Sequence, residues 1–520
     1  MASTLCCKVR SRKPQFVPTR PPNEAWTAPD FRFRALRRLP FVLVAHRRHS
    51  GITPHFRSMK VSVITLGCDK NTVDSERYVA QLADRGATYT RDLDEADVVL
   101  VNTCGFIDAA KKESIDAMVE AGRLKDRGSC KAVVGVGCMV ERHKEELLSA
   151  LPEVDLFLGA SEMDRLVPEL TERGLLAAED APVPHPGVRQ FVAGLPHVRY
   201  LKVSEGCDHG CAFCAIPLMR GKHRSFTLDD IVREAQLLEA QGVREVNLVA
   251  QDLAHYGRDL RDRKLGLVDV LTALVRETSI PWIRMLYVYS SGLTPAVLEL
   301  MATESRIVPY LDMPIQHGSD AVLARMRRPE RQRTVRSRVE AIRATVPDVA
   351  IRTTCIVGFP GETAEDYETL LAFLEEIQFD PVGAFTYSAQ EGTRAAEMPD
   401  DVSEAQKRER LERLNETQRL ITSDRYEQRL GRTVRAIVDR VDDDGVQARV
   451  VWQADDIDGV TRLAGASKVA PGSFVDVELD DVVDDVDFAA TLVSVVSTPP
   501  AKARRVRALP MLGSIGSYGR

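Results

Sequence analysis

Three cysteines stand close together near the middle of the chain, at Cys207, Cys211 and Cys214. Their C-x3-C-x2-C spacing offers three thiolates to a four-iron cluster and leaves one iron without a protein ligand. Such an iron can bind a small molecule and deliver an electron to it. Two other interpretations exist: a zinc site with His209 as the fourth ligand, and buried thiols that bind nothing. The surrounding sequence favours the iron–sulfur site.

A second set of cysteines, Cys68, Cys104 and Cys138, is spread along the sequence, each beside a glycine and each after an apolar run. Apolar runs and helical stretches alternate over residues 59–175, which predicts a parallel sheet with helices on its faces. Functional sites in such sheets lie at the carboxyl ends of the strands, so these three cysteines are expected to meet there. Cys130 precedes its strand and is excluded. The alternative is that they are small apolar residues at strand ends.

A second series of strands and helices supports the C-x3-C-x2-C triplet. Six repeats of strand and helix predict a partial barrel with its chemistry at the carboxyl-end rim. The triplet follows the first of these strands. The strands are expected at residues 200–205, 245–250, 283–288, 308–313, 350–357 and 382–387.

Short alternating strands punctuated by glycine follow from about residue 432, and they predict a small antiparallel β-barrel. The fold class is therefore α/β with an added β-barrel. We divide residues 59–496 into an α/β domain (59–175), a proline-rich linker (176–198), a partial (β/α)6 barrel (199–425) and the small barrel (426–496).

The two ends of the chain are unlike the rest. Residues 1–58 hold 12 lysines and arginines against 2 acidic residues, with no helical or strand periodicity. They are a basic disordered arm, an organelle transit peptide or, as we favour, sequence upstream of a misassigned start. Residues 497–520 are expected to be disordered. No apolar run is long enough to span a membrane, and the ligand-like placement of six of the ten cysteines indicates a reducing compartment, the cytoplasm.

The order of these parts resembles the methylthiotransferases of the radical S-adenosylmethionine (SAM) enzymes, with their terminal TRAM domain, over about residues 59–496. Four strings resemble the RimO branch, which modifies a ribosomal protein: TLGCDKNTVDSE at 65–76, NTCGFIDAA at 102–110, IPLMRG at 216–221 and DIDG at 456–459. One departure is Asp69, where many family members have proline. It neighbours an expected cluster ligand.

The resemblance implies two [4Fe-4S] clusters, one on Cys68, Cys104 and Cys138 and one, which binds SAM, on Cys207, Cys211 and Cys214. The implied reaction places a methylthio group on the β-carbon of an aspartate in the small-subunit ribosomal protein twelve, with flavodoxin or ferredoxin as electron donor. Arg220 is interpreted as a partner of a carboxylate or as a solvated surface residue. Contacts with SAM are expected at Phe213, Gln251, Gly358, Gly361 and Glu362.

The small barrel is acidic, with 14 acidic against 6 basic residues over 431–490. An RNA-binding barrel should be basic, so we expect this one to dock a basic protein substrate and to meet nucleic acid only indirectly. The alternative is a solvated acidic face. The expected docking residues are Asp476, Glu478, Asp480, Asp481, Asp484, Asp485 and Asp487.

Two other functions compete with ribosomal protein methylthiolation. The first is methylthiolation of an adenosine in tRNA, which the acidic barrel and the NTCGFIDAA string disfavour. The second is a zinc-stabilised protein-binding module without catalysis, which metal analysis and anaerobic SAM cleavage would distinguish.

Overall fold

The computed structural model describes residues 58–176, 189–261, 265–465 and 468–500. The expectations for the basic leader, for most of the linker and for residues beyond 500 lie outside this range. Among the described helices, none combines the length and apolar character needed to cross a bilayer.

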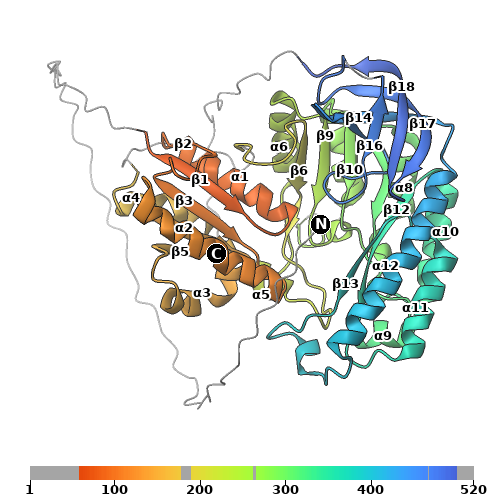
Figure 1. The fold of residues 1–520 in the computed structure, drawn as a ribbon, viewed down its shortest axis with the longest axis horizontal. Coiled ribbons are helices and arrows are strands. Elements are labelled where there is room, and N and C mark those ends of the chain that lie inside the picture. The colour runs from red at the N-terminus through yellow and green to blue at the C-terminus, as the bar shows by residue number, and fades with distance from the viewer. Residues whose placement is uncertain (1–57, 177–188, 262–264, 466–467, 501–520) are drawn as a thin grey trace, which may run out of the picture. The chain divides into compact units, whose positions relative to one another are not determined.

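The first sheet is parallel and has the strand order β2-β1-β3-β4-β5 (Figure 1). Every residue of β3 and β4 is buried, as expected for strands covered by helices on both faces. The α/β domain predicted from alternating apolar runs is confirmed. Its strands are β1 (Lys60–Thr65), β2 (Thr88–Tyr89), β3 (Val98–Thr103), β4 (Ala132–Gly137) and β5 (Leu156–Gly159), and its helices are α1 (Asp69–Ala83), α2 (Asp108–Arg127), α3 (Cys138–Ala150) and α4 (Leu166–Glu172).

The second sheet is also parallel, in the order β13-β12-β11-β10-β9-β6, and is the predicted six-stranded partial barrel. Helices pack on one face of it in a single large apolar core. Its strands are β6 (Val198–Lys202), β9 (Glu245–Val249), β10 (Trp282–Met285), β11 (Ile307–Asp312), β12 (Ala350–Val357) and β13 (Val382–Thr386). Its helices are α5 (Ile216–Arg220), α6 (Leu228–Ala240), α7 (Leu267–Glu277), α8 (Pro295–Thr303), α9 (Asp320–Arg325), α10 (Gln332–Thr345), α11 (Ala364–Ile377) and α12 (Glu404–Glu427), and a short β7 (Ser204–Glu205) pairs with β8 (Arg224–Ser225).

The carboxyl-terminal strands close into a barrel in the order β14-β15-β16-β18-β17 (blue in Figure 1). One pair, β16 with β18, is parallel, whereas the other pairs are antiparallel. A ring of five strands cannot alternate direction all the way round, so one parallel pair is unavoidable. The strands are β14 (Thr433–Asp442), β15 (Gly445–Val450), β16 (Thr461–Ala464), β17 (Phe474–Val483) and β18 (Asp487–Ser497).

The small barrel packs on the second sheet through a shared apolar core that includes Leu286 and Tyr310 from the sheet and Phe488 from the barrel. A buried carboxylate strengthens this contact. Glu245 of β9 lies 2.8 Å from Arg284 and 2.7 Å from Arg449 of β15. Burial raises the pKa of Glu245, but the two arginines outweigh it and hold that pKa below its ordinary value.

Candidate functional site

Cys68, Cys104 and Cys138 lie together at the carboxyl edge of the first sheet. Cys68 and Cys138 begin α1 and α3, and Cys104 follows β3. Burial raises the pKa of the Cys138 thiol to about 12 against the opposing charge of Arg220, and Cys68 and Cys104 contribute to this rise, so the three sulfurs are electrostatically coupled. The backbone at Gly67 passes close to Cys104, since a Cβ atom added to Gly67 would lie 2.9 Å from the Cys104 sulfur. Gly67 also has φ +85°, a conformation that favours glycine.

Cys207, Cys211 and Cys214 occupy the loop between β7 and α5. Burial raises the pKa of Cys214 to about 12 and that of Cys207 to about 11, and coupling among the three thiols adds to both shifts. Neutral thiols of this kind must lose protons to bind metal. The Cys211 sulfur lies 3.4 Å from the Tyr289 hydroxyl and 3.8 Å from the Arg328 guanidinium, two polar groups that can support a thiolate.

His209 is engaged by groups other than the three cysteines that follow β7. Its Nε2 atom lies 2.8 Å from Asp252 Oδ2, and its ring stacks on Tyr289 at 4.1 Å between centroids. The two other described cysteines, Cys130 and Cys355, show no electrostatic coupling to either set. Each set therefore offers three thiols, and this donor set fits a cluster that keeps one iron open.

Helix α5 brings the two sets of cysteines close to each other. Cys138 packs against Ala215 and Met219, which directly follow the second set. Arg220, at the end of α5, donates from Nε to the Cys138 sulfur at 3.0 Å. The second set therefore continues directly into a helix that contacts the first.

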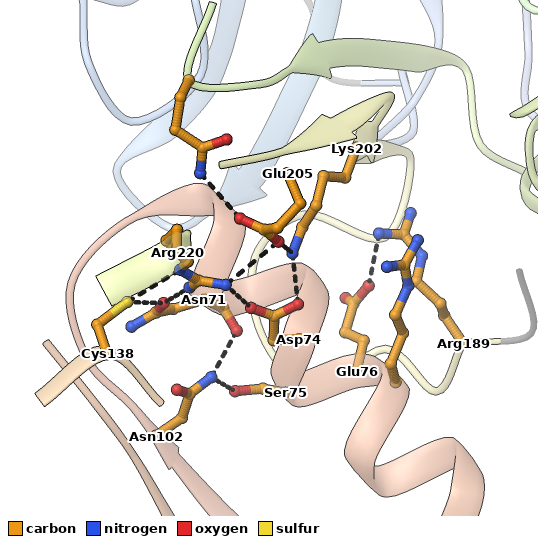
Figure 2. Close-up of polar contacts among 12 residues, drawn as sticks. Asn71, Asp74, Ser75, Glu76, Asn102, Cys138, Arg189, Lys202, Glu205 and Arg220 are labelled. Carbon is orange, nitrogen blue, oxygen red and sulfur yellow. Dashed lines mark hydrogen bonds and ion pairs between the residues drawn. The ribbon is translucent and has the colours of Figure 1, made fainter. Parts of the chain in front are cut away.

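Arg220 is also the centre of a buried polar network (Figure 2). Its guanidinium donates to Asp74 Oδ2 at 2.6 Å and to Asn71 Oδ1 at 2.5 Å, and its side chain is 5% exposed. Of the two interpretations of Arg220, the solvated one is wrong, and the carboxylate partner is confirmed. Asn71 and Asp74 both lie in the first part of α1, and the sequence around residue 220 contains no signal that points to them.

Two further charges complete this network. Lys202 lies 2.5 Å from Asp74 and 2.7 Å from Glu205, which also receives a hydrogen bond from Gln251 Nε2 at 2.9 Å. Burial would raise the pKa of Glu205, but Lys202 and Arg220 hold it far below its ordinary value. Two acids and two bases thus balance each other between the cysteine sets. Gln251 borders this network, and its Oε1 atom is buried without a partner among the described residues.

The turn at residues 358–362 is held by protein contacts. Glu362 accepts the backbone N–H of Gly358 at 2.7 Å and pairs with Arg410 at 2.7 Å. A Cβ atom on Gly358 would lie 2.3 Å from Lys407, and the Gly361 N–H donates to Asp401. SAM contact at these three residues stays a prediction, and the carboxylate of Glu362 is the least available.

Phe213 packs against an apolar cluster that includes Ala212, Val322 and Phe359. Packing of this kind is a role that an aromatic residue in the cysteine loop can have without any bound ligand. A stacking contact with an adenine stays a prediction.

The seven acids expected to dock a substrate differ in availability. Asp487 is buried, accepts the Val460 N–H and pairs with Arg462, so it is the least available of the seven, and its docking role stays a prediction. This carboxylate is needed to hold the start of β16. Asp476 pairs with Arg435, Asp484 with Arg462 and Asp485 with Arg419. Of the seven, Glu478, Asp480 and Asp481 are exposed and have no cation partner among the described residues.

A cavity of about 320 Å³ adjoins Cys68. Its walls include Asp69, Tyr200, Tyr287 and Asp455, from the first sheet, the partial barrel and the small barrel. The other five cysteines of the two sets are not among its lining residues, so it borders one end of the site.

Comparisons with known proteins agree along the chain. Residues 60–159 match the uncharacterized protein family UPF0004, residues 201–374 the radical SAM superfamily and residues 430–493 the TRAM domain. The ribosomal protein uS12 methylthiotransferase RimO of Desulforudis audaxviator is 42% identical over 422 residues, covering 80% of this chain and 93% of the relative. The RimO protein of Anaeromyxobacter sp. (strain Fw109-5) is 42% identical over 467 residues, covering 88% and 98%. Among solved structures, the radical SAM methyltransferase TsrM of Kitasatospora setae matches with a TM-score of 0.48 and 14% identity, over 63% of this chain and 73% of that one.

Proposed function

The chain belongs to the RimO family of ribosomal protein uS12 methylthiotransferases, and from this premise we propose that it transfers a methylthio group to the β-carbon of an aspartate in that protein. The reaction takes place in the cytoplasm, with flavodoxin or ferredoxin as the source of electrons. The three matched regions fit a division into an α/β domain, a radical SAM barrel and a TRAM barrel at 59–175, 199–425 and 426–496.

Two groups of thiols hold the cofactors in this proposal. Cys207, Cys211 and Cys214 bind the cluster that takes SAM, and Cys68, Cys104 and Cys138 bind a second cluster. When bound, these groups supply the carbon radical that an unactivated β-carbon requires and the sulfur that is transferred. The coupling of the thiols within each set supports this assignment.

The protein's own residues join the two groups of ligands through α5, which contacts Cys138. Arg220 and Lys202 neutralise Asp74 and Glu205 in a region with little solvent. Tyr289 and Arg328 bring polar hydrogens to the Cys211 sulfur and help to fix its position.

One observation carries the proposal. Cys138 packs against α5 directly after the Cys207–Cys214 loop, so the residues that would hold the two cofactors adjoin each other in one site. Separate sites would need a substrate that moves between them.

The test is anaerobic reconstitution with iron and sulfide, followed by iron analysis, SAM cleavage and mass spectrometry of uS12. The unchanged protein should carry about eight irons and add about 46 Da, the mass of CH2S, to one aspartate. Replacing Cys68, Cys104 and Cys138 by alanine should leave about four irons and SAM cleavage but abolish the mass gain. Replacing Cys207, Cys211 and Cys214 should abolish SAM cleavage. A mass gain on tRNA instead of uS12 would contradict the proposed substrate.

A further inference from the structure

The cavity beside Cys68 has walls from four separate segments of the chain. Residues 67–76 form the first wall, residues 193–200 the second, Leu286 and Tyr287 the third, and residues 455–457 of the small barrel the fourth. Its volume of about 320 Å³ is at the lower end of the range for small-ligand sites and is enough for one long side chain.

The wall that follows Cys68 contributes a buried carboxylate. The side chain of Asp69 is 6% exposed, and its Oδ1 atom lies 3.2 Å from Lys70 Nζ and 3.4 Å from the Tyr287 hydroxyl. Its Oδ2 atom is buried and has no partner among the described residues. A buried carboxylate oxygen without a donor is costly, and a ligand that donates to it would remove that cost.

The wall from the small barrel contributes a second buried carboxylate. Asp455 is 9% exposed, and no hydrogen bond or ion pair of the described chain engages its carboxylate. Burial raises the pKa of Asp455 to about 7; Arg449 opposes this shift and Asp456 adds to it. Asp456, next in the chain, also lines the cavity.

The cations near this cavity already have partners. Arg199 pairs with Glu76 at 3.4 Å, donates to two backbone carbonyls and stacks on Phe191. The lining holds four acids against Arg199, so its net charge is negative. Tyr200 and Tyr287 add two aromatic rings, of which the Tyr287 ring already carries Lys70, with Nζ 3.3 Å from its centroid. Carboxylates beside aromatic rings favour an ammonium or guanidinium group on an aliphatic stem.

We propose that this cavity binds a lysine or arginine side chain of the substrate protein, close in its sequence to the modified aspartate. The inference rests on the proposed function and adds to it the site that orients the substrate. A cation held between Asp69 and Asp455 would place the neighbouring backbone of the substrate beside Cys68, and therefore beside the first set of cysteines.

The test uses the reconstituted holoenzyme and its steady-state kinetics with uS12. We expect Asp455→Asn and Asp69→Asn each to raise the KM for uS12 about ten- to a hundredfold, with iron content and the KM for SAM unchanged. The matched control is Asp443→Asn, which removes one exposed acid of the same small barrel that is not among the residues lining the cavity. It should leave the KM for uS12 unchanged.

A second arm changes the substrate and leaves the enzyme intact. Each lysine or arginine within a few residues of the modified aspartate of uS12 is replaced by methionine. One replacement should raise the KM of the unchanged enzyme as Asp455→Asn does, and the two changes together should have little more effect than either alone. This arm decides the question if Asp455→Asn loses iron.

Two results would overturn the inference while leaving the proposed function standing: normal KM values for uS12 in both arms, or a raised KM for SAM alone, which would make the cavity a SAM site. If the unchanged enzyme adds no mass to uS12, the proposed function fails, and the inference fails with it.

Discussion

Replacing Arg220 by glutamine tests the network between the two sets of cysteines. The change removes one positive charge from a cluster of two acids and two bases, so Lys202 alone must balance Asp74 and Glu205. It also removes the N–H donor to the Cys138 sulfur. Leaving a buried charge without its partner destabilises proteins by about 3–5 kcal/mol.

The assay is urea unfolding of the cluster-free protein, followed by circular dichroism. With a slope of about 3 kcal/mol per molar urea, the loss corresponds to a midpoint about 1 to 1.7 M lower. The urea midpoint of Arg220→Lys should lie between those of the unchanged protein and Arg220→Gln, because lysine keeps the charge but cannot reach Asp74, Asn71 and Cys138 at once.

The matched control is Arg413→Gln, which breaks the ion pair with Glu368 on the surface, where the two side chains are 52% and 55% exposed. Its effect should be below about 1 kcal/mol. If Arg220→Gln lowers the midpoint no more than Arg413→Gln does, the reasoning from burial is wrong.

Three further changes test other parts of the structure. Gly67→Ala should lower iron content after reconstitution, because φ is +85° and the new Cβ would lie 2.9 Å from the Cys104 sulfur; Gly86→Ala, with φ +84° and open space, should strain the backbone alone and keep the iron. Glu245→Gln should destabilise the contact of the small barrel by about 3–5 kcal/mol at neutral pH. The folded pKa of Glu245 is lowered, so its contribution to stability is present above about pH 4.3 and is lost as the pH falls. The variant should therefore lose less stability than the unchanged protein below that pH. Parallel curves of stability against pH for the two proteins would refute this. Changing Glu478, Asp480 and Asp481 together to lysine should raise the KM for uS12, more at low salt than at high salt, and a salt-independent effect would argue against electrostatic docking.

The positions of both sets of cysteines follow from sequence for a topological reason. The carboxyl ends of parallel strands meet at one edge, so Cys68, Cys104 and Cys138 could be grouped although some 35 residues separate each from the next. The partial barrel was equally predictable, because each of its strands is a compact apolar run between helices.

Other features depend on contacts that no local pattern encodes. Arg220 meets Asp74 across 146 positions of the chain, and a sequence motif for α5 contains no information about that partner. Asp487 sits in an acidic run that suggests a solvated surface, yet the register of β18 turns it toward Arg462 and buries it. The cavity beside Cys68 could not be predicted for the same reason, since its walls come from four segments.

The shared core between the small barrel and the second sheet has a consequence for truncated forms of this protein. A chain cut near residue 425 would leave the apolar side chains of Leu286, Val308 and Tyr310 uncovered, and Arg284 would lose its carbonyl partner at Val451. Such a fragment would aggregate during expression rather than behave as a smaller enzyme. Proteolysis should likewise give no stable core that ends before β14.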